Sequence, residues 1–89
     1  MKEIDIKQLT KKEIEQMGIK NWPVWTKGPS VFDWEYDMTE QCYILEGEFE
    51  VKTAQNTYHI KAGDFVTFPK RLKCTWRIIK PVRKHYNFI

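Results

Sequence analysis

The residues best suited to chemistry in this sequence are one carboxylate and two thiols, those of Glu40, Cys42 and Cys74. Glu40 and Cys42 are two residues apart, so they would point to the same side of an extended strand. A carboxylate can act as a general base, and a thiol can act as a nucleophile or a proton donor. The two cysteines lie 32 residues apart and form no C-x-x-C pair. This excludes the spacing of a zinc ribbon or a thioredoxin motif, and we expect two reduced thiols.

The composition sets the size and class of the protein that holds these residues. The 89 residues are enough for one small domain, and 42% hydrophobic residues beside 30% charged residues are typical of a globular chain. The four Trp, four Tyr and five Phe must therefore supply much of the core. No apolar run approaches the length of a membrane span, and residues 1–8 do not resemble a secretory signal. We expect a cytoplasmic protein with no membrane partner.

Charge is divided between two parts of the sequence. The segment 33–50 contains seven acidic residues and no Lys or Arg, whereas 65–89 contains seven basic residues and no acidic one. A basic end with interleaved aromatic residues is one signature of nucleic-acid binding. We favour the alternative, in which acidic and basic strands pair across one sheet.

Local patterns predict a short helix near the start of the chain. Residues 3–7 alternate between polar and apolar, as in a half-exposed strand. Thr10 and Glu13 then form a capping box, and Gly18 is placed to end the helix in a left-handed conformation.

The rest of the sequence is typical of an all-β fold. Turn residues separate eight short hydrophobic runs. Two of these breaks are Glu46–Gly47, where we expect a hairpin turn, and Lys80–Pro81. Alternation places Phe49 and Val51 on one face of their strand, and it sends Cys74 and Trp76 inward if Arg77 faces water. The predicted strands are 23–26, 31–36, 42–45, 49–53, 57–60, 65–68, 74–79 and 82–88. Such a series predicts an antiparallel sandwich or barrel with no second domain.

Two segments carry a family resemblance. Residues 40–47, EQCYILEG, and residues 63–69, GDFVTFP, resemble parts of the two motifs of the cupin superfamily. Glu40 and Gly47 match the second half of the first motif, and Gly63 and Pro69 match the first half of the second. The chain also resembles the small single-domain cupins of the ureidoglycine aminohydrolase-like (DUF861) and ethanolamine-utilisation groups. The resemblance implies a cupin-type antiparallel β-barrel, or jelly roll, over 21–89, preceded by the N-terminal strand and helix of 1–20.

The resemblance also implies that the usual cupin metal site is lost. Metal cupins hold a divalent ion with three histidines and the motif Glu, but here the first two histidine positions fall on Trp34 and Tyr36, or on Asp33 and Glu35. The third falls on Cys74, and a motif Gly falls on Arg71. We therefore expect no cofactor; the alternative is a zinc, manganese or iron site with Glu40, Cys42 and Cys74 as ligands. The two histidines present, His59 and His85, lie outside both motifs and are expected on the surface or in packing.

Several functions are consistent with this pattern. The first is a cavity that binds a small organic molecule through Trp34, Tyr36, Glu40, Cys42, Cys74 and Trp76. An alternative is a metal-dependent or metal-free cupin enzyme, aminohydrolase-like or sugar-modifying; without a metal, Glu40 would be the general base and Cys74 the nucleophile or proton donor. The cavity could also simply be filled by its aromatic side chains. Another class is an interaction module that forms a homodimer. In each case a buried Glu40 carboxylate must either be protonated or take a partner.

Overall fold

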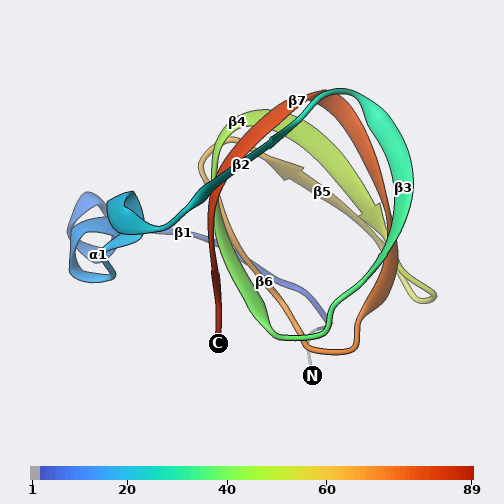
Figure 1. Ribbon diagram of the computed structural model, residues 1–89, viewed down its shortest axis with the longest axis horizontal. Helices are drawn as coiled ribbons and strands as arrows, with labels where there is room; N and C mark the ends of the chain where they lie inside the picture. Colours follow the sequence, from blue (N-terminus) through green and yellow to red (C-terminus); the bar gives the residue numbers. More distant parts are fainter. Residues whose placement is uncertain (1–2) are drawn as a thin grey trace.

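The computed structural model describes residues 3–89, which form a curved antiparallel sheet with a short helical segment at one side (Figure 1). The strands are β1 (Asp5–Gln8), β2 (Val24–Lys27), β3 (Ser30–Glu35), β4 (Glu40–Lys52), β5 (Thr57–Lys61), β6 (Asp64–Phe68) and β7 (Lys73–Phe88). The helical segment comprises α1 (Lys11–Gln16) and a single 3-10 turn, η1 (Ile19–Asn21). The predicted all-β fold is confirmed. No helix among residues 3–89 is long and apolar enough to cross a membrane.

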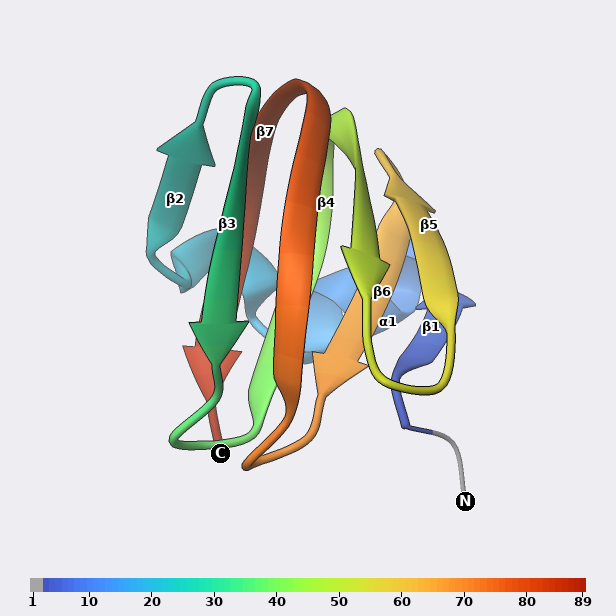
Figure 2. The ribbon, with the colours of Figure 1, turned by 90° about the vertical axis from the view of Figure 1, so that its right-hand side faces the viewer.

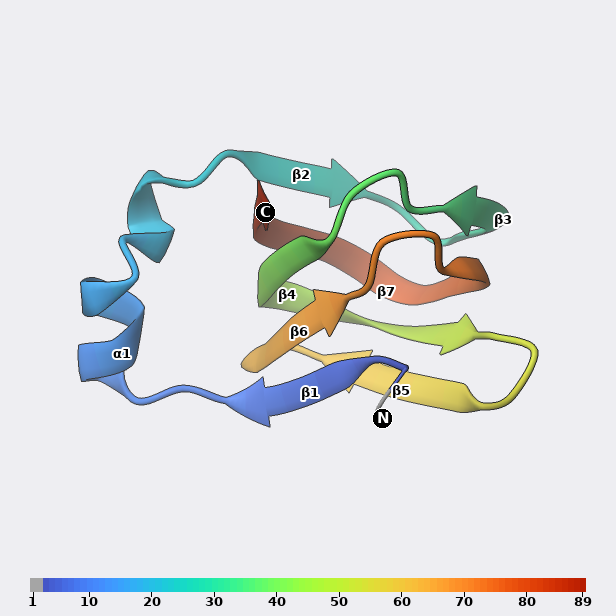
Figure 3. The same cartoon turned by 90° about the horizontal axis from the view of Figure 1, so that it is seen from below.

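The two longest strands, β4 and β7, organise the sheet. They pair with each other at the centre of the sheet, whose strand order is β1-β6-β4-β7-β2. In addition, β5 pairs with β4 and β3 pairs with β7. Figure 2 shows β3, β7 and β4 side by side, and Figure 1 shows the strands curving around a common interior. Seen from below, β1 continues into α1 beyond the end of the sheet (Figure 3).

The predicted capping box at the start of the short helix is confirmed by both of its hydrogen bonds. Thr10 Oγ1 accepts a hydrogen bond from the Glu13 backbone N–H at 3.1 Å, and the Glu13 carboxylate accepts from the Thr10 N–H at 2.9 Å. Gly18 follows the helix with φ 66°, the left-handed conformation expected of it. The helix has no buried residue, so these caps contribute much of the local order.

The prediction of eight strands from residue 23 onward is wrong at two breaks. Neither Glu46–Gly47 nor Lys80–Pro81 interrupts its strand, so the predicted hairpin turn at Gly47 does not exist. Instead, the register between β4 and β7 shifts three times between Ile44 and Phe49. Such bulges bend strands, and they tolerate a proline that donates no hydrogen bond. Each long strand therefore crosses the breaks that the sequence pattern predicted.

Gly47 is required at the place where these strands bend. Its φ is 105°, and a Cβ added there would lie 2.3 Å from the Pro81 carbonyl oxygen and 2.8 Å from the Val82 Cα. Only a residue without a side chain permits this approach of β4 to β7.

The core lies inside the curved sheet and follows the predicted alternation. Phe49 and Val51 are fully buried, as are Ile44 and Val66, and Trp76 is 2% exposed. Trp76 stacks on Phe49 with ring centroids 4.2 Å apart and an angle of 7° between the rings. The prediction that Cys74 and Trp76 point inward is confirmed.

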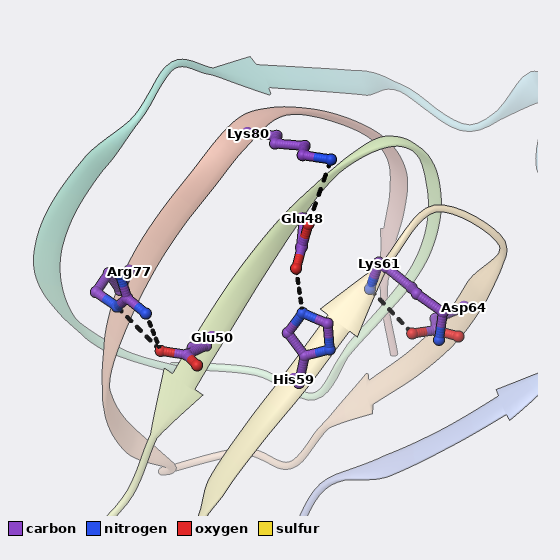
Figure 4. A network of polar contacts seen from close by, with 7 residues as sticks. All are labelled: Glu48, Glu50, His59, Lys61, Asp64, Arg77 and Lys80. Carbon is purple, nitrogen blue, oxygen red and sulfur yellow. Dashed lines mark hydrogen bonds and ion pairs between the residues drawn. The ribbon is translucent and has the colours of Figure 1, made fainter.

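The outer face of β4 and β7 carries the predicted pairing of acidic and basic strands (Figure 4). Arg77 donates to Glu50 Oε1 at 2.6 Å, and Lys80 Nζ lies 3.7 Å from Glu48 Oε1. His59 also contacts the Glu48 carboxylate, which holds the pKa of Glu48 below its usual value. These pairs are exposed, so water and salt screen them and each contributes little to stability.

Candidate functional site

A buried ion pair joins the start of β4 to the end of β7. Lys84 Nζ donates a hydrogen bond to Glu40 Oε2 at 2.6 Å. The side chains are 6% and 7% exposed, respectively, so both charges lie inside the protein. Lys84 is thus the partner that a buried Glu40 was expected to need. A charge-assisted bond at this distance offsets much of the cost of removing both groups from water.

Lys84 points inward because the alternation of β7 continues past Pro81. The buried residues of this strand all have even sequence numbers, so they lie on one face: Cys74, Trp76, Ile78, Val82 and Lys84. Lys84 was not among the predicted site residues, because the sequence pattern indicated a strand end at Lys80–Pro81. The even spacing from Trp76 was the signal that could have found it.

Two indole rings surround the Lys84 ammonium. Its Nζ lies 4.9 Å from the ring centroid of Trp25 and 4.9 Å from that of Trp76. Trp25 is the residue of β2 that pairs directly with Lys84, whereas Trp76 comes from the same strand as Lys84. Cation–π attraction in a site shielded from water contributes about 2 kcal/mol. The ammonium is therefore held by a carboxylate and two aromatic faces.

The ion pair lies in the wall of a cavity of about 600 Å³. The charged residues that line the cavity are Lys27, Asp33, Glu40 and Lys84. Its aromatic lining consists of Trp25, Phe32, Trp34, Tyr36, Trp76, Tyr86 and Phe88. The size and the mostly aromatic lining are those of small-molecule sites in other proteins.

The structure brings four of the six predicted ligand-binding residues to this cavity. Trp34, Tyr36, Glu40 and Trp76 line it. Tyr36 is buried and stacks on Phe68 with ring centroids 4.9 Å apart, whereas Trp34 is 53% exposed. Of the two registers that the resemblance left open, the one on Trp34 and Tyr36 places both side chains at the cavity.

The two thiols lie elsewhere. Cys42 is fully buried and does not line the cavity, and Cys74 borders a separate hollow next to Asp33, Trp34 and Thr53. Burial raises the pKa of Cys42 to about 12 and the pKa of Cys74 to about 11. A thiol must ionise to act as a nucleophile, so burial opposes the predicted catalytic role of Cys74. The buried ion pair of the cavity is therefore Glu40 with Lys84, and neither thiol joins it.

The three candidate metal ligands are not brought together. Within residues 3–89, no group of three or more His, Cys, Asp or Glu side chains is arranged to hold an ion. The alternative site of Glu40, Cys42 and Cys74 is therefore not assembled, and the Glu40 carboxylate is already bonded to Lys84. The two histidines are placed as expected, since His59 contacts Glu48 on the surface and His85 Nδ1 lies 2.9 Å from the Trp22 carbonyl oxygen.

One buried polar atom near the cavity has no partner. Trp76 Nε1 is shielded from solvent and makes no hydrogen bond within the described residues. The Tyr36 hydroxyl and the Cys74 thiol lie near it, but neither pair has the geometry of a hydrogen bond. Burial raises the pKa of Tyr36 well above the usual value. An unpaired indole N–H costs about 1–3 kcal/mol.

The turn between β6 and β7 supports Tyr36. The backbone N–H of Tyr36 donates to the Leu72 carbonyl at 3.0 Å, and the Arg71 N–H donates to the Tyr36 carbonyl at 2.7 Å. Arg71 has φ 74°, which is unfavourable for a residue with a side chain. This is the position at which the resemblance placed a motif glycine.

The fold and the cavity together define a small barrel of the cupin type, and comparison with known proteins identifies the family. Residues 14–86 match the model of the EutQ-like cupin domain. The chain belongs to this family, as the sequence resemblance predicted.

Solved structures agree with this assignment. A DUF861 family protein from Thermotoga maritima is 48% identical, with a TM-score of 0.96 over 98% of this chain and 100% of that one. A protein assigned to ethanolamine utilization (EutQ) from Salmonella typhimurium is 25% identical, with a TM-score of 0.64 over 93% of this chain and 66% of that one. The EutQ protein of Clostridium difficile shares the fold, with 17% identity, a TM-score of 0.66 and coverage of 93% and 64%. The chain thus spans about two thirds of each EutQ protein. No match is found among curated proteins.

Proposed function

We propose that this protein binds a small, uncharged, ring-containing organic molecule in the cavity beside Glu40 and Lys84. The observation that carries the proposal is the buried ion pair between these residues, with Nζ and Oε2 2.6 Å apart, in the wall of an aromatic cavity. Aromatic walls supply apolar contact area, and a few fixed polar groups orient a ligand.

The charge balance of the cavity favours an uncharged ligand. Its lining contains two cationic residues, Lys27 and Lys84, and two anionic residues, Asp33 and Glu40. The charge of Lys84 is already balanced by Glu40 and by two indole faces. An anion would have to compete with Glu40, and a cation would have to displace Lys84, so each would lose an existing contact.

The remaining hydrogen-bonding groups favour a ligand that both donates and accepts. Lys84 donates to Oε2 of Glu40, and the second carboxylate oxygen, Oε1, is a further acceptor. A hydroxyl or amide N–H on the ligand could donate to Oε1. An oxygen next to it could accept from the Lys84 ammonium, which has three N–H donors.

A thermal-shift screen tests this proposal with uncharged cyclic probes, namely monosaccharides, lactams and phenols. A probe at about 100 times its dissociation constant should stabilise the native protein by about 2.7 kcal/mol and raise Tm accordingly. The stabilisation should shrink in Glu40→Gln and persist in Glu50→Gln, because Glu50 forms an ion pair on the outer face of the same two strands. Equal stabilisation of both variants, or a response to charged probes alone, would contradict the proposal.

A further inference from the structure

We propose that Lys84 is a nucleophile that forms an imine with an aldehyde or ketone bound in the cavity. The inference rests on the proposed function, because the carbonyl compound must enter the cavity that we assign to small molecules. It extends that function from reversible binding to a covalent step and names carbonyl compounds as the ligand class.

The surroundings of Lys84 suit this step. Its amine is buried in the wall of the cavity, where the rings of Trp25 and Trp76 replace water as its neighbours. A lysine amine attacks a carbonyl group once it has lost its proton, and the carboxylate and indole faces that hold the ammonium make a nearby proton acceptor necessary. The Glu40 carboxylate, 2.6 Å away, is positioned to take the proton that the ammonium must lose.

The step balances with these two side chains alone. The proton of the Lys84 ammonium passes to Glu40, and the free amine attacks the carbonyl carbon, which forms a C–N bond. A proton moves from this nitrogen to the former carbonyl oxygen and gives a neutral carbinolamine. Glu40 then returns its proton to the hydroxyl group, the C–O bond breaks, and water leaves. No oxidant or reductant is needed.

The product keeps the charge distribution of the site. Before the reaction a positive ammonium faces a negative carboxylate, and afterwards a positive protonated imine faces the same carboxylate. The carboxylate and the two indole faces that hold the ammonium can therefore hold the imine as well.

Lys27 provides a matched comparison within the cavity. It also lines the cavity, and its Nζ lies 5.4 Å from the ring centroid of Phe32. Unlike Lys84, Lys27 is exposed and has no carboxylate partner among the described residues. If contact with the cavity were sufficient for reaction, Lys27 would react at least as fast as Lys84.

The test is reductive trapping of the wild-type protein with benzaldehyde and sodium cyanoborohydride near neutral pH. Peptide mass spectrometry over time should show benzylation of Lys84 about 10-fold faster than that of Lys27 or the exposed Lys80. Glu40→Gln should slow the labelling of Lys84 and leave that of Lys27 unchanged. If Lys27 and Lys80 are labelled while Lys84 in the wild-type protein is not, the inference is overturned, whatever the variant does.

The outcome also separates this inference from the proposed function. Stabilisation by uncharged probes without labelling of Lys84 would overturn the imine alone. If such a probe binds and Lys84 is labelled, the probe should slow the labelling of Lys84 but not that of Lys80. Unchanged labelling of Lys84 in the presence of a bound probe would contradict a shared site.

Discussion

Lys84 and Glu40 are brought within 2.6 Å of each other by the pairing of β7 with β4, and no other pair of opposite charges in the described chain is as deeply buried. The Cα partner of Lys84 on β4 is Ile44, and that of Glu40 on β7 is Phe88. The two side chains therefore meet across the inner face of the sheet, four residues apart in register.

Removal of one member of this pair should be strongly destabilising. Lys84→Met or Glu40→Gln leaves a buried partner without its ion pair, and we expect each to lower the free energy of unfolding by about 3–5 kcal/mol. The double variant should lose much less than the sum of the two, because it leaves no unpaired charge. Urea unfolding of the four proteins measures this directly.

The outer pair of the same strands is the control. Glu50→Gln and Arg77→Met disrupt an ion pair of the same length whose side chains are 32% and 56% exposed. Each should change the free energy of unfolding by less than about 1 kcal/mol. Equal costs for the inner and outer pairs would show that burial of Glu40 and Lys84 does not matter.

Gly47→Ala should destabilise the protein by about 1–3 kcal/mol or more. The new Cβ would meet the Pro81 carbonyl at 2.3 Å at a backbone φ of 105°. Gly28→Ala is the matched control, since nothing lies within 4 Å of its Cβ position and its φ is not in the left-handed region. Chemical denaturation of both variants gives the comparison, and an unchanged stability in Gly47→Ala would be inconsistent with the close approach of β4 and β7.

Arg71→Gly should stabilise the protein, which is the unusual direction for a glycine substitution. The left-handed conformation at φ 74° costs a residue with a side chain about 1–2 kcal/mol. Part of this gain is offset by the greater freedom of glycine in the unfolded chain, so we expect a net gain of about 0.5–1 kcal/mol. Lys70→Gly, one residue earlier in the same exposed turn, should give no gain. A lower Tm for Arg71→Gly than for the wild type would contradict this prediction.

Stability should fall in alkaline solution because of the buried thiols. Burial raises the pKa of Cys42 from its ordinary value of 9.0 to about 12 in the folded protein. Below pH 9 the thiol is protonated in both states, and its contribution to stability is fully present. As pH rises from 9 toward 12 the unfolded state loses its proton first, so this contribution is progressively lost.

Urea unfolding at about pH 8 and about pH 10.5 tests this contribution. The decrease in free energy between the two conditions should be smaller in Cys42→Ala than in the wild type. Each protein is compared with itself at the two pH values. The cost of replacing the thiol by a smaller side chain is the same at both and therefore cancels. An identical decrease in the two proteins would contradict the burial effect.

Local patterns predicted much of the fold. The capping box at Thr10 and Glu13 depends on contacts three residues apart, and the inward phase of Phe49 and Trp76 depends on strand alternation, so both were readable from neighbouring residues. The continuity of β4 past Gly47 was not, because the glycine serves an approach to Pro81, 34 residues away. A glycine in a turn and a glycine at a bulge have the same sequence signal.

The candidate site was predicted only in part, because local patterns reveal some of its residues but not the strand pairing that joins them. The motif resemblance identified Glu40, and alternation placed Trp76 inside. The partner Lys84 and the indole of Trp25 required the pairing of β7 with both β4 and β2, which no local pattern contains. The predicted homodimer and small-molecule ligand stay predictions, and their tests are in solution.

The measurement that tests the central claim most directly is a ¹⁵N-edited NMR titration with the uncharged cyclic probes. The four Trp indole N–H groups serve as reporters, because Trp25, Trp34 and Trp76 line the cavity while Trp22 packs against Phe65 outside it. We predict saturable shifts of the three cavity indoles, with Trp22 unchanged, and loss of these shifts in Glu40→Gln. Shifts of Trp22 as large as those of Trp76, or no shift with any probe, would contradict a binding site at Glu40 and Lys84.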